Sequence, residues 1–242
     1  DDEALEAILK EPLSQWRIFL HPSQKRAVEV KSSGPVRVLG GAGTGKTVAL
    51  IHRAVLLVRE RLEPEERVLV TTYTRNLALE LAASIRKLTT DEEFARIDVQ
   101  HIHKVARDLL AGQGICPEIA SDAQREAAWD SALEKIPAGI TYPRAFYEDE
   151  WRNVIVPHDI QSASEYMKAS RRGRGTSVHK LKRAQIWPVF QAYRDALNKK
   201  SLMEWDDLIV EARDLVMQQP ELCQWRALLS DEVQDYKAGE LR

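Results

Sequence analysis

Residues 35–47 read PVRVLGGAGTGKT. The first six residues are mainly apolar and β-branched, and a glycine cluster follows them, which is typical of a buried strand that ends in a tight loop. The lysine and threonine that close the stretch open an expected helix over 46–61. The stretch therefore predicts a strand, a loop and a helix in direct succession.

The loop at 40–47, GGAGTGKT, fits the pattern G-x-x-x-x-G-K-[ST]. Its glycines let the backbone turn tightly and present N–H groups to phosphate oxygens, and the helix that follows favours an anion at its N-terminus. Lys46 can reach the β- and γ-phosphates, and the Thr47 hydroxyl can ligate magnesium. We therefore expect ATP and Mg2+ as cofactors, bound by Gly41, Ala42, Gly43, Thr44, Gly45, Lys46 and Thr47.

Strand-like and helix-like segments alternate through the first part of the chain. This alternation implies βαβ units and a mainly parallel sheet, so the predicted fold class is α/β. The expected helices lie at 4–12, 21–30, 46–61, 75–88 and 103–111, and the expected strands at 35–40, 66–73 and 95–100.

From about residue 112 the pattern becomes helical. Helices are expected at 121–136, 144–156, 161–170, 183–199 and 201–219, and the next strong strand within WRALLSDEVQD at 225–235. We interpret 112–199 as a helical insertion subdomain. The α/β domain around it would be discontinuous, formed by 1–111 and 200–242.

The acidic motif SDEVQD at 230–235 ends an apolar stretch. In an ATPase with such a loop, an acid at the tip of a neighbouring strand holds magnesium and a second acid activates the attacking water. Asp231 suits the first role and Glu232 the second. Gln234 would sense the γ-phosphate or orient the water. With Lys46, these residues form the predicted catalytic set.

Taken together, these motifs resemble the UvrD/Rep branch of superfamily 1 DNA helicases. GGAGTGKT and DEVQD occur in that order with a helical insertion between them, and LHPSQKRAV (20–28) resembles the Q motif. VTTYTRNLALEL (70–81), VQHIHKVARDLL (99–110) and MEWDDLIVEA (203–212) resemble further family motifs. The resemblance covers nearly the whole chain and is weaker over the insertion.

The resemblance implies a RecA-like domain that serves as the first motor domain of an ATP-dependent 3′-to-5′ DNA helicase. Gln24 would read the adenine edge. Tyr73, Thr74 and His103 stand at DNA-contacting positions, although Tyr73 could instead close the strand against the core and His103 could be structural. The implied partner is single-stranded DNA or a duplex/single-strand junction.

The sequence departs from the family pattern at several places. Val48 stands where an adenine-stacking arginine is frequent, Arg75-Asn76 where Asn-Lys is usual, and His101 where Thr is usual. The chain stops at Arg242, before the motifs that would supply a second motor domain and its arginine fingers. We therefore expect the 242 residues alone to bind ATP with near-background turnover and no unwinding.

A basic stretch without Asp or Glu runs between Tyr166 and Arg194 and contains RRGRGT. Its glycines would let the backbone approach phosphates, so Arg171, Arg172 and Arg174 are predicted to contact the DNA backbone. The alternative is a solvated basic loop.

Composition sets broader limits. The net charge is −2, hydrophobic residues make up 44% and charged residues 30%, and the only cysteines are Cys116 and Cys223, which predicts a cytoplasmic protein with two buried, reduced thiols. No apolar run approaches the ~20 residues of a membrane span. Two other classes of function remain. One is a nucleotide-gated DNA- or protein-binding module. The other is a P-loop kinase or another small-molecule enzyme, and DEVQD and the motif around Tyr73 disfavour this second class.

Overall fold

The structure is a computed structural model that describes residues 20–32 and 34–236. The helix expected at 4–12 lies outside the described residues. The chain divides into two compact units. The sheet unit comprises the residues up to Val105 together with Pro220–Asp235, and the helical unit comprises Ala106–Gln219 and the segment from Tyr236.

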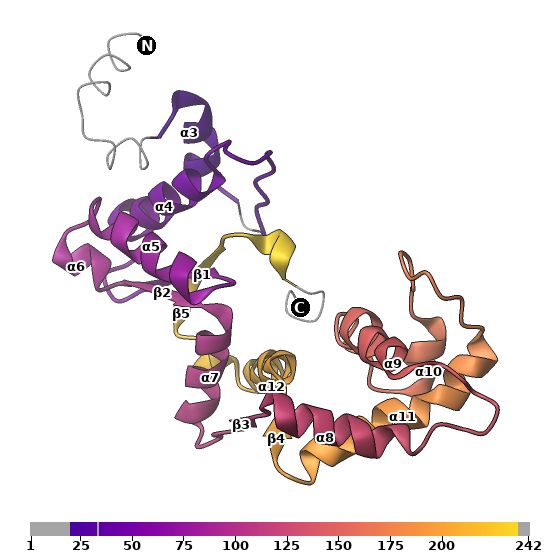
Figure 1. The fold of residues 1–242 in the computed structure, drawn as a ribbon. Coiled ribbons are helices and arrows are strands. Elements are labelled where there is room, and N and C mark those ends of the chain that lie inside the picture. The colour runs from indigo at the N-terminus through magenta and orange to yellow at the C-terminus, as the bar shows by residue number, and fades with distance from the viewer. Residues whose placement is uncertain (1–19, 33, 237–242) are drawn as a thin grey trace. The chain divides into compact units, whose positions relative to one another are not determined.

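Three parallel strands form the centre of the sheet unit (Figure 1). They are β1 (Arg67–Thr72), β2 (Ile97–His101) and β5 (Trp225–Ser230), in the order β2-β1-β5. The strands predicted at 66–73 and 95–100 are confirmed, as is the strand at the start of 225–235. Helices and parallel strands therefore mix as the sequence predicts for an α/β fold.

Helices connect and cover these strands. One face of the sheet packs against α4 and α5, where a buried cluster joins Val68 and Val70 of β1 to Ile51, Ala54, Leu81 and Ile85. The helices of this unit are α3 (Pro22–Glu29), α4 (Lys46–Leu56) continued by the π-helical turn η1 (Leu57–Arg61), α5 (Arg75–Arg86) and α6 (Asp91–Phe94). Helix α7 (Ile102–Gly112) begins in the sheet unit and continues into the helical unit.

The strand predicted at 35–40 is not formed. A strand requires a ladder of backbone hydrogen bonds to a neighbour, and within the described part of the chain this segment belongs to no sheet. Its apolar side chains are consequently exposed, Val36 by 49%, Val38 by 44% and Leu39 by 75%. The prediction of a buried strand directly before the loop is therefore wrong for this structure.

The helical unit has a large aromatic core. Trp129 stacks on Tyr193 with ring centroids 4.0 Å apart, and Trp151 meets Tyr193 edge to face at 4.9 Å. Each predicted helix is present: α8 (Asp122–Leu133), α9 (Arg144–Glu150) with the π-helical turn η2 (Trp151–Ile155), α10 (Ala163–Lys168), α11 (Lys180–Asn198) and α12 (Trp205–Gln218).

The structure also contains a short parallel pair of strands, β3 (Glu118–Ile119) with β4 (Leu202–Met203). The sequence pattern did not predict this pair, because two-residue strands leave no periodic pattern. The observed unit boundaries also differ from the expected ones, since α12 belongs to the helical unit. Glu204, the N-cap of α12, accepts hydrogen bonds from Trp151 Nε1 at 2.6 Å and the Tyr193 hydroxyl at 3.0 Å. These bonds tie α12 to the aromatic core.

Two further expectations concern exposure. Cys116 and Cys223 are both exposed, so the prediction of buried thiols is wrong; each lies in a connection between elements, where burial is uncommon. Within residues 20–32 and 34–236, no helix combines the length and the apolar character that crossing a bilayer requires.

Candidate functional site

The glycine-rich loop turns directly into α4. Gly43 and Gly45 have φ values of +73° and +77°, which side chains with a Cβ rarely adopt, and Gly45 is the N-cap of the helix. A Cβ at Gly45 would also collide with the side-chain amide of Gln24. The backbone conformation therefore explains why glycine stands at this position.

Lys46 folds back over its own loop. Its Nζ donates hydrogen bonds to the carbonyl oxygens of Gly40 and Gly41, each at 2.9 Å. The ammonium is thereby held at the N-terminus of α4, where the helix dipole also favours an anion. Backbone carbonyls are uncharged partners, so a phosphate group can replace them with a stronger, charge-assisted contact.

Thr47 and Asp231 lie 184 positions apart in sequence but are joined in the structure. The Thr47 hydroxyl donates to Asp231 Oδ2 at 2.8 Å, and Asp231 is 9% exposed. The Asp231 backbone N–H donates to the carbonyl oxygen of Thr71 at 2.9 Å, which holds the acid at the carboxyl end of β5. A hydroxyl and a carboxylate supply the hard oxygen ligands that Mg2+ prefers, so this pair fits the implied cation.

The acidic motif continues in a tight turn. Glu232 has φ +50°, a left-handed conformation that is uncommon for a residue other than glycine, and Gln234 Nε2 donates to the Glu232 carboxylate. A 3-10 turn, η4 (Val233–Asp235), follows. The structure thus brings Asp231, Glu232 and Gln234 into one turn directly after β5.

Gln24 contacts the glycine-rich loop. Its Nε2 donates to the carbonyl oxygen of Thr44 at 2.9 Å, while its Oε1 accepts from the His21 backbone N–H at 3.0 Å in a capping box at the start of α3. Sequence reasoning assigned this amide to adenine and missed its contact with the loop. The capping-box pattern in HPSQ was the available signal for the second bond.

Tyr73, Thr74 and His103 cluster near the ends of β1 and β2. The rings of Tyr73 and His103 meet edge to face with centroids 5.7 Å apart, and both residues are partly exposed. The Thr74 hydroxyl caps α5 by accepting from the Leu77 backbone N–H at 3.3 Å. The sequence thus predicts a DNA role for Thr74 where the structure gives it a local capping role.

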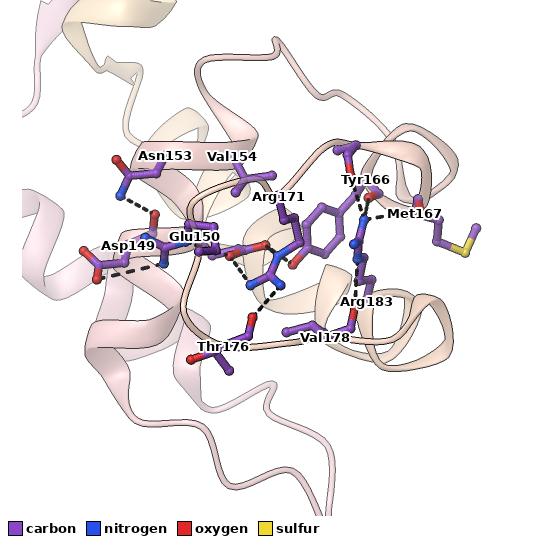
Figure 2. A network of polar contacts seen from close by, with 12 residues as sticks. Asp149, Glu150, Asn153, Val154, Tyr166, Met167, Arg171, Thr176, Val178 and Arg183 are labelled. Carbon is purple, nitrogen blue, oxygen red and sulfur yellow. Dashed lines mark hydrogen bonds and ion pairs between the residues drawn. The ribbon is translucent and has the colours of Figure 1, made fainter.

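Figure 2 shows a network that accounts for part of the basic stretch. Glu150 is fully buried, and its carboxylate accepts from Arg171 Nε at 2.5 Å, Arg171 Nη2 at 2.8 Å and the Tyr166 hydroxyl at 2.8 Å. Arg171 Nη1 donates to the Thr176 carbonyl oxygen at 2.7 Å. The Arg171 side chain is only 6% exposed, so it offers little surface to DNA, and its contact with DNA stays a prediction.

The electrostatics agree with an interior role. The hydrogen bond to Glu150 raises the pKa of Arg171, and burial, followed by the nearby charge of Glu150, raises the pKa of Tyr166. Arg174 is held more loosely, with Nε 3.6 Å from Glu150 and Nη2 3.9 Å from Asp149. The sequence missed this network because Glu150 lies outside the basic stretch.

Only some cations of the stretch face the solvent. Arg183 donates to the carbonyl oxygens of Val178 at 3.1 Å and Ala169 at 2.8 Å, which fastens both ends of the loop between α10 and α11. The exposed cations are Lys168, Arg172, Lys180 and Lys182. Of the three arginines predicted to contact DNA, only Arg172 is exposed.

Comparison with known proteins places these motifs in a family. A family model described as UvrD/REP helicase N-terminal domain matches residues 20–240. The chain is 25% identical to a probable DNA helicase II homolog of Rickettsia felis and 26% identical to DNA helicase II of Escherichia coli (strain K12). It is also 25% identical to the ATP-dependent DNA helicase PcrA of Leuconostoc citreum.

Each of these three matches covers 89% of this chain, but only 33%, 30% and 29% of the respective relative. The chain thus spans about a third of the length of the curated relatives it matches. The activity of those full-length proteins is therefore only a proposal for this chain.

Proposed function

The chain belongs to the UvrD/REP helicase N-terminal domain family, and on that premise we propose that it is the ATP-binding first motor domain of an ATP-dependent DNA helicase. The sheet unit is then the RecA-like part, and the helical segment an insertion within it. Its partners are single-stranded DNA or a duplex/single-strand junction and a second motor domain. The 3′-to-5′ direction rests on the family resemblance.

The observation that carries this proposal is the hydrogen bond of 2.8 Å between Thr47 and Asp231. It joins the phosphate loop to the acidic motif and brings two oxygen ligands for a divalent cation beside Lys46. Magnesium, when bound there, would neutralise phosphate charge. Lys46 would hold the terminal phosphates, Glu232 would accept a proton from the attacking water, and Gln234 would keep Glu232 oriented.

Titration with a fluorescent ATP analogue tests the proposal. We expect saturable binding that Mg2+ strengthens, and we expect Asp231→Asn to lose most of that strengthening, because an amide is a neutral and weaker ligand. Asp98→Asn is a suitable control, since Asp98 lies on β2 and its carboxylate accepts hydrogen bonds from Arg67 and Trp225. Binding that is insensitive to Mg2+ in the unmodified chain would contradict the proposal.

We also propose that the 242 residues, assayed alone, turn ATP over slowly. An arginine finger is worth roughly 10³–10⁵ in the rate of phosphoryl transfer, and the resemblance assigns these arginines to a second motor domain. A steady-state assay with saturating single-stranded DNA should give near-background rates. Rapid turnover that Glu232→Gln abolishes would show that these residues suffice.

A further inference from the structure

Two successive threonines end β1 with buried side chains. Thr71 is 2% exposed and Thr72 is 0% exposed. Among the described residues, neither side-chain oxygen has a hydrogen-bond partner. A buried hydroxyl without a partner costs free energy, so each of these groups needs an explanation.

The two hydroxyls lie on opposite faces of the sheet, because successive side chains of a strand alternate. Val68, Val70 and Thr72 share one face, and the two valines pack in the buried cluster that includes Ile51 and Ala54 of α4. The Thr72 side chain therefore continues this row on the face that α4 covers, and Lys46 and Thr47 are the first two residues of that helix.

The register of the sheet places Asp231 beside Thr72. Val70 pairs with Leu229 and Thr71 with Ser230, and Asp231 comes next on β5. The hydrogen bond from the Asp231 backbone N–H to the Thr71 carbonyl oxygen continues the parallel ladder by one step. Leu229 is partly buried and packs against the cluster under α4, so Asp231, two residues further along the chain, shares its face with Thr72.

Thr71 lies on the other face. Its register partners are Gln100 on β2 and Ser230 on β5, and Gln100 Oε1 is likewise buried without a partner among the described residues. Thr71 thus has the chemistry, burial and strand of Thr72, but it points away from α4. The pair separates an effect of position from an effect of residue type.

We propose that Thr72 is a positioning residue of the divalent-cation site, whose hydroxyl hydrogen-bonds to the hydrated cation held by Thr47 and Asp231. The inference rests on the proposed function. Mg2+ keeps several of its waters when it binds to proteins, and these waters need polar partners. A threonine hydroxyl both donates and accepts, and such outer partners fix the orientation of the ligands of a metal.

The chemistry of the substitution makes the idea testable. Valine has nearly the shape of threonine and lacks the hydroxyl. If Thr72 serves only to pack the strand, Thr72→Val leaves nucleotide binding unchanged. If the hydroxyl hydrogen-bonds to the hydrated cation, the same substitution has two opposite effects. It removes an unsatisfied buried group from the nucleotide-free protein, and it weakens binding of the cation. A role in packing alone does not predict these opposite effects.

The experiment measures the affinity of the 242-residue chain for a fluorescent ADP analogue, with Mg2+ and with EDTA. The ratio of the two dissociation constants is the gain due to the metal. We expect Thr72→Val to reduce this gain by about tenfold, the scale of a hydrogen bond to a charged group. Thr72→Ser should retain most of the gain, and Thr71→Val should retain all of it.

The nucleotide-free melting temperature provides the second readout. We expect Thr72→Val to melt no lower than the unmodified chain, and affinities in EDTA to agree for all variants. An unchanged metal gain in Thr72→Val overturns the inference, as does an equal loss in Thr71→Val. Absence of any metal gain in the unmodified chain overturns the proposed function and this inference with it.

Discussion

In the sheet unit the cation of the phosphate loop, Lys46, rests on two backbone carbonyls, whereas in the helical unit Arg171 is bound by both oxygens of a buried carboxylate, Glu150. Neutral partners can be exchanged for a ligand at low cost. A buried ion pair cannot, because removal of one partner leaves the other charge uncompensated in a medium of low polarity. The two cations therefore have different availability.

The difference extends to the surrounding residues. In the sheet unit, Thr47 and Asp231 join segments far apart in sequence and lie at the carboxyl end of the strands. In the helical unit, Arg171 donates to the Thr176 carbonyl oxygen as well as to Glu150, and Arg183 donates to the Ala169 carbonyl oxygen, so both contribute to holding the loop between α10 and α11. The cation of the spaced motif thus contacts only neutral groups of its own loop, whereas cations of the basic run hold the fold of the helical unit.

The largest effect that the comparison predicts is on stability. Glu150→Gln should reduce the free energy of unfolding by about 3–5 kcal/mol, since it leaves Arg171 buried without its charge partner. Denaturant unfolding measures the change.

The neighbouring acid supplies the control for this prediction. Asp149 has a half-exposed side chain that lies 3.9–4.0 Å from Arg174 and Arg152. Asp149→Asn should change the free energy of unfolding by no more than about 1 kcal/mol, as for a surface ion pair. Equal effects of the two substitutions would mean that the network around Glu150 does not hold the helical unit together.

Lys46→Ala probes the exchangeable cation. It should weaken binding of ATP by roughly 2–3 kcal/mol, the scale of a charged hydrogen bond, and leave stability nearly unchanged because its present partners are loop carbonyls. Titration with a fluorescent ATP analogue gives the affinity. Lys87→Ala, an exposed lysine at the end of α5, is the matched control. Indistinguishable affinities of the two variants would remove Lys46 from the site.

The sequence predicted the elements around the site well, because spacing and periodicity are local properties. Helix α4, strands β1 and β2 and the helices of the helical unit follow directly from apolar periodicity. The prediction of a strand at 35–40 is wrong for a different reason. Its apolar pattern satisfies a local rule, but strand pairing depends on a neighbour that no local pattern specifies.

The site divides in the same way. The motifs indicated the residues of the phosphate loop and of the acidic turn, but they could not indicate which long-range contacts each side chain makes. Gln24 meets the loop through Thr44, and Glu150 meets Arg171 from outside the basic stretch. Both contacts depend on tertiary packing. Counting the charges of a run in the sequence therefore overestimates how many of them are exposed.

Arg172 tests the part of the basic stretch that remains available. If Arg172 contacts one phosphate, Arg172→Gln should make the plot of log affinity against log salt less steep, by about 0.7 for single-stranded DNA. Fluorescence anisotropy with a labelled oligonucleotide at several salt concentrations gives the slope. Lys135→Gln, an exposed lysine of the helical unit outside the stretch, is the control. An unchanged slope for Arg172→Gln would favour a solvated loop.

Gln24 sharpens the comparison within the sheet unit, because its amide is occupied at both ends by Thr44 and His21. Gln24→Ala should weaken binding of ATP and GTP alike by about 1 kcal/mol, the net value of one hydrogen bond, since the lost contact braces the loop that holds phosphate. Lys25→Ala, an exposed neighbour on α3, should leave both affinities unchanged. If Gln24 instead reads adenine, Gln24→Ala should weaken binding of ATP and leave binding of GTP unchanged. Competition of both nucleotides against one fluorescent analogue distinguishes the two, and a selective loss of ATP would show that the amide leaves the loop to read the base.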